Sequence, residues 1–283
     1  MTLSQASQSK ETSLLELTPS NYYSKQADFD YWSFSVFKGF MQCEAAEMYK
    51  LQDHEEPEHP PMPLLVGNYV HSYFESPEAH AAFVAEQRAN LYRSGGKKKL
   101  ADVVQADAMI HTLEADPFFV NAYQGEKEAI VTGELYGLPW RGKIDCLNLD
   151  EGYFIDLKTA KSLNNTIWER DDSGAWRKKI WYEAYGYIMQ LAIYQQLIRQ
   201  TYGKTLVPFI FAVSKDKVPD HMGLRFNQPL LDRQLETVEQ LLPRFQKVMS
   251  GQAEPERCEE CDYCRSTKRL HGFTDAEGLM DSV

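Results

Sequence analysis

The segment GKIDCLNLDEGYFIDLKT, residues 142–159, decides the fold of this 283-residue chain. Two apolar stretches of strand length flank a short polar turn with the sequence DEG. Alternating apolar runs on either side of a turn that contains glycine are typical of an antiparallel β-hairpin. The first stretch carries Asp145 and the second carries Asp156, so each predicted strand presents an acidic residue.

The register of this hairpin determines which side chains meet. If Glu151 and Gly152 form a two-residue loop, Asp145 lies opposite Lys158, and Asp156 lies two residues along on the same face. A shift of one residue would move Asp145 to the opposite face, because side chains alternate along a strand. Convergence of the three therefore requires this pairing or a compensating bulge.

Two carboxylates on an apolar strand pair are costly to bury unless a cation compensates them. Carboxylate oxygens are the ligands that Mg²⁺ and Mn²⁺ prefer, and such an ion assists the hydrolysis of phosphodiesters. Lys158 would then position the nucleophile or neutralise developing charge. The alternative is a pair of exposed turn acids beside a surface lysine, because the pattern D-x-K is short and common.

Periodicity predicts an α/β fold in which a central mixed sheet is flanked by helices. The predicted helices cover residues 33–51, 64–75, 77–92, 100–115, 175–202 and 230–249, and the predicted strands cover residues 128–135, 138–149, 153–159, 206–213 and 223–226.

The chain is long enough for one substantial core, and we expect three parts. Residues 1–20 are polar without apolar periodicity and predict a disordered or loosely attached tail. Residues 21–250 form the predicted catalytic domain, and residues 251–283 form a cysteine-rich segment that packs on the first helix. No apolar run has the length of a membrane span and no secretory signal is visible, so we expect a cytoplasmic protein without membrane contact.

A net charge of −11 argues against a protein that passively coats nucleic acid, because phosphate binding relies on lysine and arginine. A metal-dependent enzyme escapes this objection, since bound cations reverse the local field of its acids. Two basic runs are candidates for a DNA groove, with a solvated surface as the alternative. They are Lys97, Lys98 and Lys99, and Arg177, Lys178 and Lys179.

Two pairs of residues at i, i+4 spacing lie on predicted helices before and after the hairpin. Gly67 and His71 share a helix face, and the glycine would permit close approach of another element. Gln190 and Tyr194 share a face of an otherwise apolar helix, where a glutamine needs a hydrogen-bond partner. Each pair alone has an ordinary structural explanation.

Taken in order, these four motifs resemble those of the PD-(D/E)xK nuclease superfamily, in particular its RecB-like and phage RecE-like exonuclease branch. That branch has G-x3-H on a helix, G-x-x-D and D-x-K on strands, and Q-x3-Y on the next helix. This sequence departs from it in having aspartate rather than the commoner glutamate at position 156. The resemblance implies a restriction-endonuclease-like core. It also implies metal binding by His71, Asp145 and Asp156 with help from the carbonyl of Leu157, catalysis by Lys158, and DNA steering by Gln190 and Tyr194, with Glu128 as an additional acid.

The resemblance further implies a DNA exonuclease that acts on linear double-stranded DNA in phage-type recombination or end processing. Its expected partner is a single-strand annealing protein, and a homo-oligomer is a further option. The same core also supports structure-specific or restriction-type endonucleases. A third alternative is a catalytically silent DNA-binding module.

Three cysteines, Cys258, Cys261 and Cys264, lie close together in a polar segment, which indicates metal binding. The fourth ligand would be Cys43, giving an iron-sulfur cluster, or His271, giving a zinc site. Certain RecB-like nucleases join one N-terminal cysteine to three near the C-terminus around a 4Fe-4S cluster, and this layout resembles theirs although the spacing here is more compact. Cys146, beside Asp145 on its strand, is predicted to be a core residue.

Overall fold

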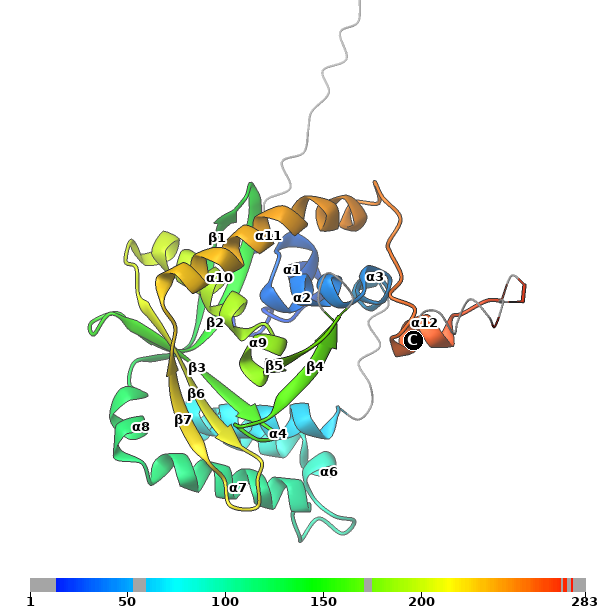
Figure 1. Cartoon of the computed structure of the whole chain (residues 1–283). Helices are drawn as coiled ribbons and strands as arrows, with labels where there is room; N and C mark the ends of the chain where they lie inside the picture. Colours follow the sequence, from blue (N-terminus) through cyan, green and yellow to red (C-terminus); the bar gives the residue numbers. More distant parts are fainter. Residues whose placement is uncertain (1–13, 53–59, 171–174, 271, 274–275, 277–283) are drawn as a thin grey trace, which may run out of the picture. The chain divides into compact units, whose positions relative to one another are not determined.

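The computed structural model of the chain describes residues 14–52, 60–170, 175–270, 272–273 and 276 (Figure 1). It divides into two compact units. Unit 1 comprises residues 1–34 and 55–240, and unit 2 comprises residues 35–54 and 241–283. The second unit therefore combines a segment near the start of the chain with the C-terminal segment. A nuclease domain that ends at residue 250 stays a prediction.

Unit 1 is built on a mixed sheet with the strand order β1-β2-β3-β6-β7. All neighbours are antiparallel except β3 and β6, which run parallel and are joined through helices, as a parallel pair requires. A separate antiparallel ribbon is formed by β4 and β5. The strands are β1 (Glu126–Leu135), β2 (Leu138–Asn148), β3 (Tyr153–Ala160), β4 (Thr166–Arg170), β5 (Trp176–Ile180), β6 (Val207–Ser214) and β7 (His221–Arg225).

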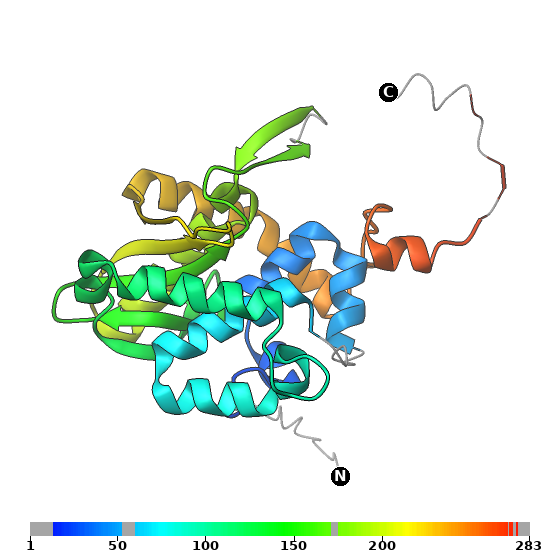
Figure 2. The ribbon, with the colours of Figure 1, turned by 90° about the horizontal axis from the view of Figure 1, so that it is seen from below.

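The chain has helices in both units, and those of unit 1 cover both faces of this sheet. The helices are α1 (Lys25–Asp30), α2 (Phe34–Gln42), α3 (Glu44–Gln52), α4 (Met62–Glu75), α5 (Pro77–Glu86), α6 (Arg88–Leu91), α7 (Ala101–Glu114), α8 (Pro117–Ala122), α9 (Trp181–Ala184), α10 (Tyr187–Tyr202), α11 (Gln228–Met249) and α12 (Asp262–Ser266). On one face α4 and α7 pack against β3 and β6, and Figure 2 shows these helices in front of the sheet. On the other face α10 packs against β1, β2 and β6. The sheet is thus buried on both sides.

Local sequence explains where the elements near the functional residues begin. Pro61 and Pro63 open α4, as expected for a first helical turn whose N–H groups need no partner. Ser76 ends α4 and begins α5, and its hydroxyl accepts the N–H of Ala79. Gly186 adopts φ 71° directly before α10, a left-handed conformation that glycine tolerates best.

The predicted α/β class with a central mixed sheet is confirmed, and several element boundaries were wrong. Of the helix predicted over residues 175–202, Trp176–Ile180 is strand β5, and the remainder is two helices, α9 and α10, with Gly186 directly before α10. The helix predicted over residues 33–51 is two helices separated at Cys43. The short helices α1, α8 and α12 were not predicted. Among the described residues no helix is long and apolar enough to cross a membrane.

The N-terminal tail predicted over residues 1–20 lies partly outside the described residues. From Leu15 onward the chain is hydrogen-bonded: Asp30 accepts the N–H of Leu15, and Tyr31 donates to the carbonyl of Leu15. This part of the predicted tail is therefore attached to α1.

Candidate active site

The central feature of unit 1 is a split between β2 and β3. These strands pair from Asn148 and Tyr153 to Cys146 and Ile155, and β2 then hydrogen-bonds to Trp32 through Pro139 and Arg141. The site lies where the two strands separate.

The turn that joins β2 to β3 differs from the predicted two-residue loop. Asn148 and Tyr153 are paired, so four residues form the loop. Asn148 stabilises this loop by accepting the N–H of Glu151 with its side chain and that of Gly152 with its carbonyl. The predicted pairing of Asp145 with Lys158 was wrong by two residues, but a shift of two preserves the face of every side chain. The acids of both strands therefore still converge.

The carboxylate of Asp145 bridges the split. Its Oδ2 accepts the backbone N–H of Leu157 at 2.7 Å, in place of a ladder hydrogen bond. Its Oδ1 lies 3.5 Å from Nδ1 of His71, a residue of α4, which packs against β3. The structure thus brings His71 to Asp145, although 74 residues separate them in the sequence (145 minus 71). At Leu157 the contact involves the N–H, and a role for its carbonyl stays a prediction.

Asp156 and Lys158 lie on the face of β3 that is turned towards α10. Lys158 Nζ is 2.5 Å from Oδ2 of Asp156, and both side chains are nearly inaccessible. The same ammonium lies 4.4 Å from the ring centroid of Tyr187, at the start of α10. A cation between a carboxylate and an aromatic ring has its charge position fixed from two sides. Tyr187 was missed by sequence analysis, although it lies one turn before Gln190.

Glu128 reaches the site from β1. Among the described residues, ligand atoms of His71, Glu128 and Asp145 all lie within 4.8 Å of one another, and Asp156 is not a member of this group. Glu128 has φ 54°, a left-handed conformation that costs energy in a residue with a Cβ. Its Oε2 pairs with Lys143 Nζ at 2.5 Å. Lys143 was also missed by sequence analysis. Its position two residues before Asp145 on the same strand could have indicated that both side chains share a face.

Burial and mutual repulsion separate the pKa values of these acids. Burial, with the negative charge of Asp145, raises the pKa of Asp156 to about 6 even though Lys158 opposes the shift. Burial and the charge of Asp145 also raise the pKa of Glu128. Burial would raise the pKa of Asp145 too, but the charge of His71 and the hydrogen bonds from His71 and Leu157 lower it overall. Neighbouring carboxyl groups whose pKa values are shifted in opposite directions are characteristic of functional sites.

Gln190 and Tyr194 on α10 complete the site from the second helical layer. Gln190 Nε2 donates to the hydroxyl of Tyr194 at 3.0 Å, which supplies the partner that a glutamine in an apolar helix needs. Its Oε1 is buried and takes no hydrogen bond from the described residues. Tyr194 lies over Gly142, where an added Cβ would be 2.8 Å from the tyrosine ring. By contrast, a Cβ at Gly67 would make an ordinary 3.6 Å contact with Thr159.

The two basic runs lie in different environments. Lys99 is bound to Asp107 at 2.7 Å and donates to Tyr69, so it is a structural group, while Lys97 and Lys98 are exposed. Arg177 and Lys178 are exposed on β5, and Lys179 is partly buried there.

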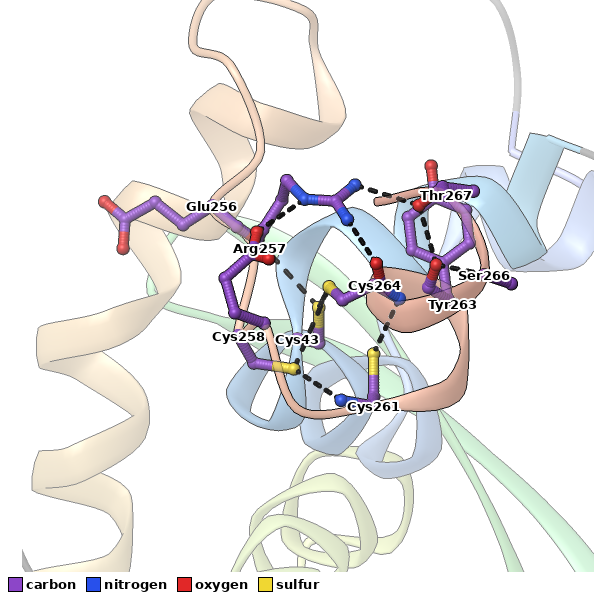
Figure 3. A network of polar contacts seen from close by, with 10 residues as sticks. Cys43, Glu256, Arg257, Cys258, Cys261, Tyr263, Cys264, Ser266 and Thr267 are labelled. Carbon is purple, nitrogen blue, oxygen red and sulfur yellow. Dashed lines mark hydrogen bonds and ion pairs between the residues drawn. The ribbon is translucent and has the colours of Figure 1, made fainter. Parts of the chain in front are cut away.

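Unit 2 contains the cysteine site, in which Cys43 lies beside the three C-terminal cysteines (Figure 3). The sulfur of Cys264 is 3.6 Å from that of Cys43 and 3.9 Å from that of Cys258, and all four sulfur atoms lie within 4.8 Å. The N–H of Cys261 points to the sulfur of Cys258, and the N–H of Cys264 points to that of Cys261. His271, the alternative ligand, lies outside the described residues.

Polar contacts join the two segments that supply these cysteines. Glu44 binds Arg244 and accepts the N–H of Glu256, and the N–H of Ala45 donates to the carbonyl of Glu256. Arg257 donates to the carbonyl of Cys264 at 2.7 Å. The C-terminal segment therefore packs on α3 within unit 2. Cys146 is not part of this site: it is buried in the core of unit 1, with Lys127 Nζ 3.2 Å from its sulfur.

Residues 33–267 match the family described as "PDDEXK-like domain of unknown function (DUF3799)". The chain belongs to this family. A crystal structure from Eubacterium rectale, of a protein described as "Putative exonuclease", is 33% identical over 95% of this chain and 100% of its own, with a TM-score of 0.86. A second solved structure, that of SSO0001, is 17% identical over 85% of this chain and 96% of its own, and its TM-score of 0.31 carries no argument. No curated protein matches the chain.

The family match and the structure from Eubacterium rectale confirm membership of the PD-(D/E)xK nuclease superfamily. The family match covers the helix of His71, the β2–β3 split and α10, so the site described above lies inside the matched region. The protein is a PDDEXK-like nuclease.

Proposed function

We propose that the protein is a Mg²⁺- or Mn²⁺-dependent exodeoxyribonuclease that hydrolyses linear double-stranded DNA. The observation that carries the proposal is the convergence of Asp145, Asp156 and Lys158 at the β2–β3 split, with His71 and Glu128 against Asp145. The proposal keeps His71, Asp145 and Asp156 as metal ligands and adds Glu128 to them.

The residues at the split fit a divalent cation. The ligand atoms of His71, Glu128 and Asp145 lie within 4.8 Å of one another, while the buried Oδ2 of Asp156 is paired with the ammonium of Lys158 at 2.5 Å. The carboxylates of Asp145 and Glu128 repel each other. The negative charge of one therefore increases the free-energy cost of burying the other in its charged form. A cation would offset this repulsion, and hard oxygen ligands suit Mg²⁺ and Mn²⁺.

When bound, the cation would stabilise the negative charge that develops on the phosphate during hydrolysis. The chain's own groups have separate tasks. Lys158, held between Asp156 and Tyr187, places a positive charge where the attacking water and the phosphate would meet. Asp145 is fixed by the N–H of Leu157, which leaves its other oxygen directed to His71 and the proposed cation. The unpaired Oε1 of Gln190 is an acceptor, so its partner would be a donor such as a water molecule or a base N–H group.

The preference for exonuclease over endonuclease is supported by the relative from Eubacterium rectale, which is described as an exonuclease and shares 33% of its residues with this chain. A structure-specific or restriction-type endonuclease is the alternative. Action in phage-type recombination with a single-strand annealing protein, a homo-oligomeric state and a cytoplasmic location are further parts of the proposal, supported only by the family resemblance and the sequence.

One assay separates these activities. Purified protein with Mg²⁺ would be incubated with linear and with closed-circular duplex DNA of the same sequence. Digestion of the linear form alone is expected. Cutting of the closed circle would instead show that the protein is an endonuclease. If neither form is cleaved, the catalytically silent DNA-binding module is the function that remains.

We also propose that the cysteines of unit 2 hold a metal, with Cys43 as the fourth ligand. A 4Fe-4S cluster is the assignment that the family resemblance favours. The sulfur spacing favours zinc, because four thiolates bonded to one ion at about 2.3 Å lie roughly 3.8 Å apart. The observed sulfur separations of 3.6 Å and 3.9 Å agree with that value. An iron-sulfur cube would place its own atoms between the thiolates and hold them further apart.

A further inference from the structure

The five tryptophans of the chain fall into two classes. Three of them, Trp32, Trp140 and Trp181, are at most 3% exposed and belong to the core. The other two, Trp168 and Trp176, are each 58% exposed, and both lie on the β4–β5 ribbon. Exposed indoles are expensive to leave in water, and two on one small element mark an interaction surface.

The register of the ribbon places both indoles on one face. Trp168 is paired with Lys178. Two residues away on each strand, Trp176 is paired with position 170. Because side chains alternate along a strand, Trp168, Lys178 and Trp176 share one face. Lys178 Nζ lies 5.1 Å from the ring centroid of Trp168. Arg177 and Lys179 face the other side of the ribbon. Together with Lys178 they form a run of three consecutive cations in a chain of net charge −11.

The base of the ribbon is anchored in unit 1. Trp181 is buried and donates its indole N–H to the carbonyl of Leu163 at 3.0 Å, and both strands contact α9. Figure 2 shows the ribbon projecting from the sheet of unit 1. A two-stranded ribbon is marginally stable by itself, so this one depends on its base.

The ribbon is also connected to the candidate active site at both ends. It follows β3, which carries Asp156 and Lys158, and it leads through α9 into α10. Trp181, at the base of the ribbon, has its ring centroid 5.9 Å from that of Tyr187. Tyr187 in turn contacts Lys158. An aromatic residue at the base of the ribbon therefore contacts the tyrosine that lies beside Lys158.

We propose that the β4–β5 ribbon binds an unpaired DNA strand, with bases stacked on Trp168 and Trp176 and phosphates contacted by Lys178 on the same face. The inference deepens the proposed function, since the strand would belong to the DNA substrate. A duplex covers the faces of its bases with neighbouring bases, whereas a single strand leaves them free for aromatic side chains. Indoles and cations on one ribbon are the combination that single-strand binding uses.

The test measures binding separately from cleavage. Fluorescein-labelled oligothymidine and a blunt duplex of equal length would be titrated with full-length protein, with no divalent metal added. The double variant Trp168→Ala/Trp176→Ala should bind oligothymidine roughly tenfold or more weakly, with duplex binding changed much less. Trp168→Phe/Trp176→Phe should keep most of the affinity, because phenylalanine still stacks. Phe118→Ala, which removes an aromatic side chain that is 69% exposed outside the ribbon, is the matched control and should leave binding unchanged.

A second measurement does not depend on any variant. Oligothymidine should quench the tryptophan emission of the wild-type protein at its red edge, where the two exposed indoles emit, and leave the emission of the three buried tryptophans unchanged. Failure of the wild-type protein to bind oligothymidine, unchanged affinity in the alanine variant, or an equal loss for duplex DNA would each overturn the inference. Single-strand binding by a protein that cleaves no DNA with Mg²⁺ would instead count against the proposed function alone.

Discussion

Gly142 lies directly beneath the ring of Tyr194, and a Cβ atom at position 142 would be 2.8 Å from the ring carbons Cδ1 and Cε1. Two of the sequence motifs, G-x-x-D and Q-x3-Y, are thereby explained by a single contact between β2 and α10. Gly142→Ala should destabilise the protein by about 1–3 kcal/mol, because a close-packed interior cannot absorb the methyl group. Thermal unfolding would show the loss, and Tyr194→Leu in the same chain should recover part of it. Equal losses with and without the second change would contradict this packing.

Asp145→Asn, Asp156→Asn and Lys158→Ala should each lower Mg²⁺-dependent DNA cleavage by roughly a thousandfold or more, since each removes a charge from the reacting centre. Asp150→Asn, on the turn of the same hairpin, is the matched control and should retain activity. Initial rates on end-labelled duplex DNA provide the measurement. Near-normal cleavage by either aspartate variant would refute the assignment.

The raised pKa of Asp156 predicts a pH dependence of stability. Without Mg²⁺ the folded protein holds the proton of this carboxyl up to about pH 6, whereas the unfolded chain releases it near pH 4. The stabilising contribution is therefore complete below about pH 4 and is lost as the pH rises to about 6, with an upper limit of about 3 kcal/mol. Urea unfolding of the wild type and of Asp156→Asn between pH 4 and 7 isolates this effect. The difference should narrow on addition of Mg²⁺ at pH 7, and a pH-independent difference would exclude the shift.

Tyr187 is expected to position Lys158 through its ring and not through its hydroxyl. Tyr187→Phe should retain most of the activity, while Tyr187→Ala should lower kcat roughly tenfold with a smaller change in KM, because the ammonium loses a cation–π contact. The alkaline limb of the pH–rate profile should move to lower pH in the alanine variant only. Identical profiles for both variants would remove Tyr187 from this role.

The cysteine site predicts one metal per chain that depends on Cys43. Cys43→Ser should lose the metal and unfold at lower temperature, whereas Cys146→Ala should retain the metal because its thiol lies in the core of unit 1. Elemental analysis of protein purified without oxygen should find zinc. Brown protein that contains iron would favour the cluster instead, and retention of metal by Cys43→Ser would show that another residue is the fourth ligand.

Patterns with strong local causes were predictable from the sequence, and patterns set by tertiary contacts were not. The acids of the β2–β3 hairpin converge as predicted even though the loop length was wrong, because a two-residue error leaves the alternation of faces intact. The β4–β5 ribbon was missed because the apolar periodicity of α10 seemed to extend back through Trp176, and only the left-handed Gly186 marks where that helix starts. Glu128 was identified only as an additional acid, since its left-handed φ has no local sequence signal.

The order in which a ribosome makes the chain sets a constraint on unit 2. Cys43 and Cys264 are 221 residues apart in sequence, yet their sulfur atoms are in contact. Residues 35–54 are therefore synthesised before nearly all of the nuclease core, and they lack residues 241–283, with which they form unit 2, until synthesis is almost finished. During that interval Cys43 has no thiolate neighbours to share a metal. Metal loading is thus a late event in biosynthesis, and a chain truncated before residue 258 would carry the nuclease residues but no complete metal site.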